Sequence, residues 1–242
     1  MELQSKPIIQ NQSLRVTKIP GSVLPALALA IALTHSAGVA GAVAQEAGGL
    51  PRLTFTKVLE GSVPEFTEIS IDSTGSGTYD GRPLKDPPGP RPLKLSPATT
   101  QQLFALAHAM NDFNSIDLES HKNVANLGRK TFTYEAGGRK STAQFNYSVR
   151  REAQALTELF EKIASVEEHI KALEFQTKYD HLSLPRELLL IQIDLDNKAL
   201  ADPELMVPAL QSIAHDSHFL HLAQVRAQAI LERLGANDER SR

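Results

Sequence analysis

The chain has 242 residues, of which 41% are hydrophobic and 22% are charged, a composition typical of a folded globular protein. Its net charge of −3 argues against a broad basic surface, so nucleic acid is not an expected partner. Cysteine is absent, which excludes disulfides, thiol nucleophiles and cysteine-based zinc or iron–sulfur sites.

The first 44 residues have the pattern of a secretory signal peptide. A basic start precedes an apolar run from Val23, and small residues precede the cleavage site expected after Ala44. Two alternatives stay open. Residues 22–44 are long enough for an uncleaved membrane anchor, and a buried core helix would have to accommodate Pro25. We expect an exported protein, periplasmic or extracellular, with no stable membrane insertion after cleavage.

Residues 45–180 are predicted to form an α+β domain in the order β-β-β-α-β-β-α. LTFTKVLE alternates as a strand does, and EFTEISIDSTGSGTYDG predicts two strands around a glycine-containing turn. Ile69 and Ile71 should face one side of the sheet, opposite Glu68 and Ser70. The five prolines of GRPLKDPPGPRP then predict a loop, partly in polyproline conformation.

A helix and a hairpin follow the proline-rich segment. In LSPATTQQLFALAHAMNDF, Ser96 suits the N-cap and Pro97 the first helical position, and apolar residues recur at helical spacing. In KTFTYEAGGRKSTAQFNYS, alternating aromatic residues predict two strands. Gly137-Gly138 supplies the positive φ angles that a tight turn between them needs.

A long helix is predicted next, over NYSVRREAQALTELFEKIASVEEHIKALEF. Its apolar residues are spaced three and four apart from Leu156 to Leu173, which suits packing against a sheet or another helix. Glu167, Glu168 and His169 are assigned to its charged outer face. Together these elements predict an antiparallel sheet with helices packed on one face.

Residues 53–165 resemble small exported bacterial domains of unknown function. The resemblance rests on EFTEISIDSTGSGTYDG, the LS…LFALAHAMNDF helix and the TFTYEAGG…STAQFNY hairpin. These motifs concern packing and turns, so the resemblance implies the order of elements and export, and it carries no activity.

Residues 181–235 are predicted to form an α-helical extension, and residues 236–242 a disordered tail. Helices are expected over SLPRELLLIQIDL and ADPELMVPALQSIAH, the second with Asp202 as N-cap and Pro203 first. A third helix, SHFLHLAQVRAQAILERLG, should end at Gly235.

Residues 203–234 resemble a single HEAT-type helical hairpin. The matching positions in the two helices and the turn are Pro203, Leu205, Leu210, Asp216, Arg226, Ala229 and Leu231. About one extra turn of helix separates Asp216 from Arg226, which departs from the pattern. A single hairpin is not a solenoid, so the resemblance implies a helical cap on the first domain.

Three histidines lie three residues apart near this hairpin. His215 and His218 are the candidate metal ligands, because imidazole clusters bind divalent zinc, nickel and copper. The alternative is a helix junction, in which the chain bends near Asp216 and the histidines merely mark the turn. A hydrolase that uses His215, His218, Asp216 and His121 is the second functional hypothesis, although the sequence contains no GxSxG, HExxH or P-loop motif.

The loop over residues 118–130 is the preferred binding surface, because loops carry function more often than cores do. Glu119, His121, Asn123 and Asn126 are its candidate binding residues. The first functional hypothesis is therefore a non-catalytic binding or interaction module without a required cofactor. This loop and the exposed sheet face would meet an unknown protein or small ligand in the cell envelope.

Overall fold

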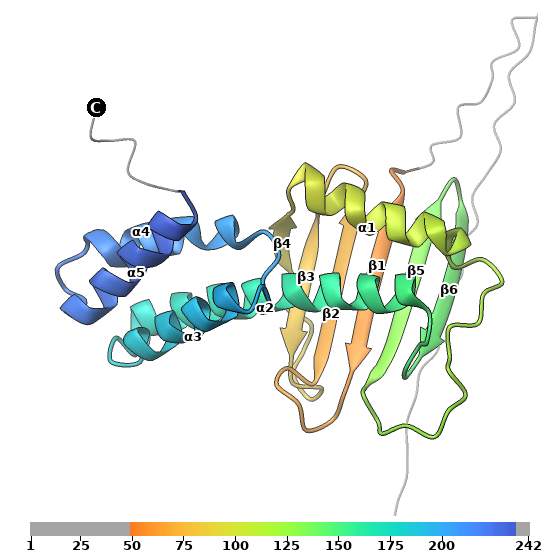
Figure 1. Ribbon diagram of the computed structural model, residues 1–242, viewed down its shortest axis with the longest axis horizontal. Helices are drawn as coiled ribbons and strands as arrows, with labels where there is room; N and C mark the ends of the chain where they lie inside the picture. The colour runs from red at the N-terminus through yellow and green to blue at the C-terminus, as the bar shows by residue number, and fades with distance from the viewer. Residues whose placement is uncertain (1–48, 236–242) are drawn as a thin grey trace, which may run out of the picture. The chain divides into compact units, whose positions relative to one another are not determined.

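The structure is a computed structural model that describes residues 49–235, and it consists of an antiparallel sheet with helices on one face and further helices at its C-terminal end (Figure 1). The predicted α+β class and helical C-terminal region are confirmed. The predicted signal peptide, residues 1–44, and the predicted tail, residues 236–242, lie outside the described residues.

Six strands, five α-helices and two short 3-10 helices make up residues 49–235. In chain order they are β1 (Arg52–Val58), β2 (Phe66–Asp72), β3 (Ser76–Arg82), β4 (Arg91–Lys94), α1 (Pro97–Ala109), η1 (Asn111–Phe113), β5 (Arg129–Ala136), β6 (Arg139–Phe145), α2 (Arg151–Tyr179), α3 (Leu184–Asp196), η2 (Pro203–Met206), α4 (Val207–His215) and α5 (His221–Arg233). The strands form one sheet in the order β4-β3-β2-β1-β5-β6, with antiparallel neighbours throughout.

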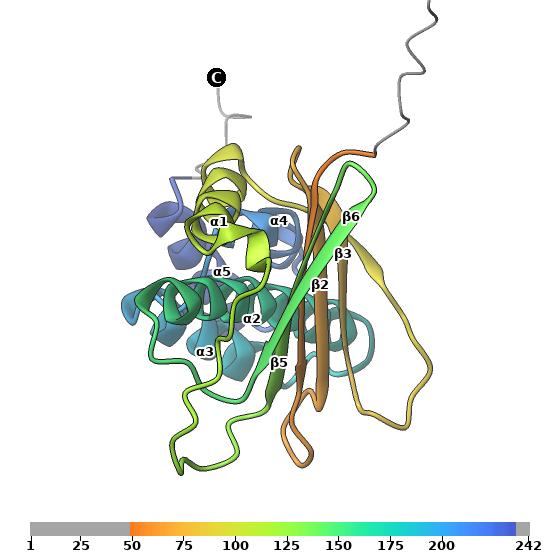
Figure 2. The ribbon, with the colours of Figure 1, turned by 90° about the vertical axis from the view of Figure 1, so that its right-hand side faces the viewer.

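Alternation along the strands divides the sheet into a covered and an open face. Ile69 and Ile71 are fully buried, as predicted, whereas Glu68 and Ser70 lie on the other face, partly exposed. Helices α1 and α2 both cover the buried face (Figure 2). Phe160 of α2 stacks on Phe55 of β1 with 5.0 Å between ring centroids, which fixes the helix against the middle of the sheet.

The local signals at the start of α1 and at the turn between β5 and β6 are confirmed. Ser96 caps α1, its side chain accepting a hydrogen bond from the backbone N–H of Thr99, and Pro97 is the first residue of that helix. Gly137 and Gly138 have φ angles of 56° and 73° and join β5 to β6.

Strand β4 begins within the last two residues of the segment that the prolines predicted to be a loop and continues to Lys94. Among residues 49–235 it pairs with β3 alone, at the edge of the sheet, and Pro92 is opposite Thr78. An edge strand tolerates proline because it pairs along one side only. The order of elements is therefore β-β-β-β-α-β-β-α, one strand more than predicted.

A second hydrophobic core lies beyond the β4 edge of the sheet (Figure 1). Helix α2 has 29 residues, and its apolar side chains pass from the sheet core to the second core between Ile163 and Val166. Leu188, Ile213 and Ile230, from α3, α4 and α5, are fully buried around it. None of the helices within residues 49–235 combines the length and the apolar character needed to cross a bilayer.

Asp202 connects the two cores in a way that the sequence did not predict. It takes the N-cap position with Pro203 first, as predicted, but the following helix begins as the 3-10 turn η2 and the Asp202 side chain makes no capping hydrogen bond to it. Its carboxylate instead accepts hydrogen bonds from the backbone N–H of Ser96 at 2.7 Å and from the hydroxyls of Ser96 and Thr99 at 2.8 and 2.6 Å. The aspartate thus adds to the capping of α1 from a distant part of the chain.

Candidate binding site

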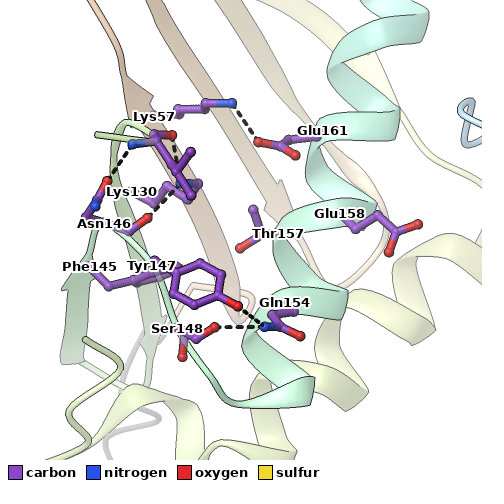
Figure 3. Close-up of a pocket in the computed structure, with 11 residues that line it drawn as sticks. Lys57, Lys130, Phe145, Asn146, Tyr147, Ser148, Gln154, Thr157, Glu158 and Glu161 are labelled. Atoms are coloured by element: carbon purple, nitrogen blue, oxygen red, sulfur yellow. Dashed lines mark hydrogen bonds and ion pairs between the residues drawn. The ribbon is translucent and has the colours of Figure 1, made fainter. Parts of the chain in front are cut away.

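A pocket lies between α2 and the end of the sheet where β1 stops and β5 begins (Figure 3). Its volume is about 320 Å³, within the range of small-molecule sites. It is lined by Lys57, Leu127, Lys130, Phe145, Asn146, Tyr147, Ser148, Gln154, Thr157, Glu158 and Glu161.

Two lysines stand at this end of the covered sheet face. In the register between β1 and β5, Lys57 pairs with Lys130. Both occupy positions that face the helices, because each lies two residues from a buried phenylalanine of its strand, Phe55 or Phe132, and so on the same face. The inward-facing position of each lysine could be predicted from the sequence, since each lysine continues an alternating run of inward-facing apolar residues. The prediction missed it because the pairing of the two strands was not known.

The ammonium group of Lys130 is buried, and all of its hydrogen-bond donors have backbone acceptors. It donates hydrogen bonds to the backbone oxygens of Leu127 at 2.9 Å, Gly128 at 3.3 Å and Asn146 at 2.9 Å. Burial lowers the pKa of Lys130, and the nearby positive charge of Lys57 lowers it further. Because three acceptors match its three donors, this lysine shapes the pocket wall and keeps no donor for a ligand.

Lys57 has a different environment. Its ammonium group contacts a carboxylate oxygen of Glu161 on α2 at 2.6 Å, across the pocket (Figure 3). The two side chains are 27% and 43% exposed, so this ion pair is reached by solvent. Within residues 49–235, Glu161 is the acceptor that the Lys57 ammonium contacts.

The remaining walls combine apolar surface with hydrogen-bonding groups. Phe145 and Leu127 supply apolar surface, and the hydroxyl of Tyr147 accepts a hydrogen bond of 3.3 Å from the side-chain amide of Gln154 (Figure 3). The same amide donates to the backbone oxygen of Ser148 at 2.9 Å. The pocket is therefore amphipathic, with the charged pair at one side and aromatic rings at the other.

The predicted binding loop lies next to this pocket, on the side of the sheet that the helices cover (Figure 2). Two of its four candidate residues hold the loop in place. The Glu119 carboxylate accepts from the backbone N–H of Asn146 at 2.6 Å, and Asn126 accepts from that of Gly128 at 3.0 Å. The hydrogen bond from Asn146, the largest effect, lowers the pKa of Glu119.

The other two candidates, His121 and Asn123, are exposed. His121 contacts the carboxylate of Asp117 at 2.6 Å, and this hydrogen bond raises the pKa of the imidazole. None of the four predicted residues lines the pocket; Leu127 and Asn146, at the end of the loop and after β6, do. A binding role for the four residues stays a prediction.

The histidines at 215 and 218 mark a helix turn, as one of the two interpretations predicted. Helix α4 ends at His215 and α5 begins at His221, although neither Asp216 nor Ser217 caps α5. Asp216 instead accepts from the backbone N–H and the ring of His218, and His215 contacts the backbone oxygen of Gln211.

The metal hypothesis gains no support from this geometry. Within residues 49–235, no three or more His, Cys, Asp or Glu side chains are grouped so that they could hold a metal ion. Helices α4 and α5 also lie beyond the β4 edge, whereas the loop that carries His121 lies toward β5 and β6 (Figure 1). A divalent metal at His215 and His218 remains an untested prediction.

The outer-face assignment of Glu167 and His169 on α2 is wrong. Both are buried. His169 is covered by α3, whereas Glu167, two residues away on another side of the helix, interacts with the charge of Arg91 on β4. Burial raises the pKa of Glu167. The ring of His169 contacts carboxylate oxygens of Glu187 at 2.6 Å and Asp194 at 3.0 Å, both on α3.

Comparison with known proteins does not assign the chain to a family. No protein-family model matches the chain, and no curated protein matches it.

Proposed function

We propose that the protein is an exported, non-catalytic binding module whose ligand site is the pocket between α2 and the β1–β5 end of the sheet. The observation that carries this proposal is a formed amphipathic cavity of about 320 Å³, with aromatic and apolar walls and one solvent-reachable ion pair. Such a combination suits recognition of a small molecule.

The polar groups around the pocket favour binding over catalysis. Lys130 donates to three backbone oxygens, and the hydroxyl of Thr157 donates to the backbone oxygen of Ala153 at 2.8 Å. The Lys130 ammonium has no lone pair, and the Thr157 hydroxyl gives its proton to a backbone oxygen and not to a side-chain base that could activate it as a nucleophile. These groups are instead engaged in holding the walls, as a rigid binding site requires.

Export is the second part of the proposal, and the N-terminal sequence supports it. The basic start, the apolar run and the small residues before Ala44 match a cleaved signal. The ligand would then be a small molecule, or part of a protein, that is present in the cell envelope or outside the cell.

A fragment screen by two-dimensional NMR tests the site. Gln154 lines the pocket, and Gln101 on α1 lines a separate cavity of about 360 Å³, so the two exposed helical glutamines form a matched pair. We expect fragments to shift the amide signals of Asn146 and Thr157. Gln154→Trp should abolish these shifts by filling the pocket, and Gln101→Trp should leave them unchanged. Fragment shifts that gather only beside Gln101, or that survive Gln154→Trp, would rule out this pocket.

A further inference from the structure

The Lys57–Glu161 ion pair separates two cavities along α2. On its other side lies a second cavity of about 340 Å³, and both cavities are lined by Lys57 and Glu161. The second cavity extends beneath Val63 and Pro64, from the β1–β2 connection, toward Ser165 of α2. The two cavities share this ion pair as a common wall, and together they are called the groove; the second cavity is also lined by Glu168, His169 and Asp194.

This ion pair is weak enough to open. Its side chains are 27% and 43% exposed, and ion pairs exposed to this degree contribute little to stability. Lys57 also lies beside Lys130 across the strand pair, and Lys130 has its own three acceptors. Any anion that replaced Glu161 would keep the Lys57 charge balanced, while Glu161 turned to solvent.

We infer that the groove binds a monocarboxylate with an apolar body, and that the ligand carboxylate displaces Glu161 from Lys57. This inference rests on the proposed function and specifies its ligand. The Glu161 carboxylate already lies 2.6 Å from the ammonium, so the position accepts a carboxylate oxygen.

The walls define the rest of the ligand. Phe145, Leu127 and the ring of Tyr147 suit an apolar or aromatic body next to the carboxylate. The facing helix carries Glu161, whose negative charge, once displaced from Lys57, would repel a dianion, whereas Glu158 is paired with Lys162 at 2.7 Å. A single negative charge is therefore preferred over a phosphate monoester or a dicarboxylate. When the ion pair opens, the second cavity can receive the far end of an elongated molecule.

The test compares 4-phenylbutanoate with its neutral amide, 4-phenylbutanamide, by NMR titration of the full folded protein. Wild-type protein should bind the acid about tenfold more tightly than the amide, the value of one charge-assisted hydrogen bond. Lys57→Met should reduce acid binding to the level of the amide. Glu161→Gln should tighten acid binding about two- to fivefold, because a neutral side chain competes less for Lys57.

A matched ion pair provides the control. Lys140 and Glu135, 2.7 Å apart, lie at the opposite end of the strands. Lys140→Met and Glu135→Gln should leave both affinities unchanged. The change in acid affinity caused by Glu161→Gln tests the inference even if the Lys57→Met variant fails to fold.

Three results would overturn the inference: equal affinities for acid and amide, an acid preference that survives Lys57→Met, or no binding of either probe. Equal binding of both probes within the pocket would contradict only the inference that the ligand carries a carboxylate, and the proposed binding function would stand. A fragment screen that finds nothing at this pocket would instead remove the proposed function itself.

Discussion

His169 should stabilise the protein in a manner that depends on pH. Its ring is 11% exposed and lies between the carboxylates of Glu187 and Asp194, so it joins α2 to α3. Burial disfavours the charged imidazolium, but the hydrogen bonds and negative charges of Glu187 and Asp194 outweigh burial and raise its pKa above 6.5. Stabilisation by a raised pKa is fully present below the unfolded value and is lost as pH rises through the folded value.

The loss of stability on replacing His169 can be estimated from its contacts with Glu187 and Asp194. A hydrogen bond to a charged group contributes about 1.5–3 kcal/mol, and breaking a buried ion pair costs about 3–5 kcal/mol. Asp194 is 35% exposed, so water replaces part of its lost contact. We therefore expect His169→Gln to lower the free energy of unfolding by about 3 kcal/mol at pH 5.5.

Urea unfolding of the wild type and of His169→Gln, followed by circular dichroism from pH 5.5 to pH 9, measures this effect. The difference in unfolding free energy should be largest at pH 5.5 and should shrink at higher pH. Glu167, whose pKa is also raised, is present in both proteins, so its contribution cancels. A difference that stays constant across this range, or grows with pH, would refute the charged state assigned to His169.

Three further predictions concern the fold and the N-terminus. Asp202→Ala removes the acceptor of the Ser96 backbone N–H, so urea unfolding should show a loss of about 2–3 kcal/mol; an unchanged midpoint would contradict the link between the cores. Gly77→Ala would place a Cβ 1.8 Å from a backbone oxygen of the neighbouring strand, so thermal unfolding should reveal a loss of about 3 kcal/mol. Gly89→Ala, with open space around its Cβ, is the control and should change stability by less than about 0.5 kcal/mol; equal effects of the two changes would exclude a steric cause. Mass spectrometry of protein from its native host should find an N-terminus directly after Ala44, and an intact N-terminal methionine on cytosolic protein would disprove export.

Local patterns in the sequence predicted most of the fold. The alternation at Ile69 and Ile71 and the glycines at 137 and 138 act through neighbours a few residues away, so the pattern alone identifies them. Strand β4 was not predicted, because proline usually argues against a strand and an edge position tolerates Pro92. Local sequence does not show which strand lies at an edge.

The candidate site depended on contacts that no local pattern contains. Lys57 and Lys130 become neighbours only through the pairing of β1 with β5, and Glu161 reaches Lys57 only because α2 crosses that end of the sheet. The burial of His169 likewise requires α3 to return along α2. The hydrogen bond by which the Glu119 carboxylate holds Asn146 beside the pocket also joins distant parts of the chain, so no local pattern predicts it; a binding role for Glu119 stays a prediction.

Native mass spectrometry of protein recovered from its host tests ligand binding in the pocket most directly. Wild-type protein and the Gln101→Trp variant should carry a non-covalent small-molecule adduct, and Gln154→Trp, in which the pocket is filled, should lack it. The same adduct on all three proteins, or no adduct on the wild type, would contradict the proposal that this pocket holds the ligand.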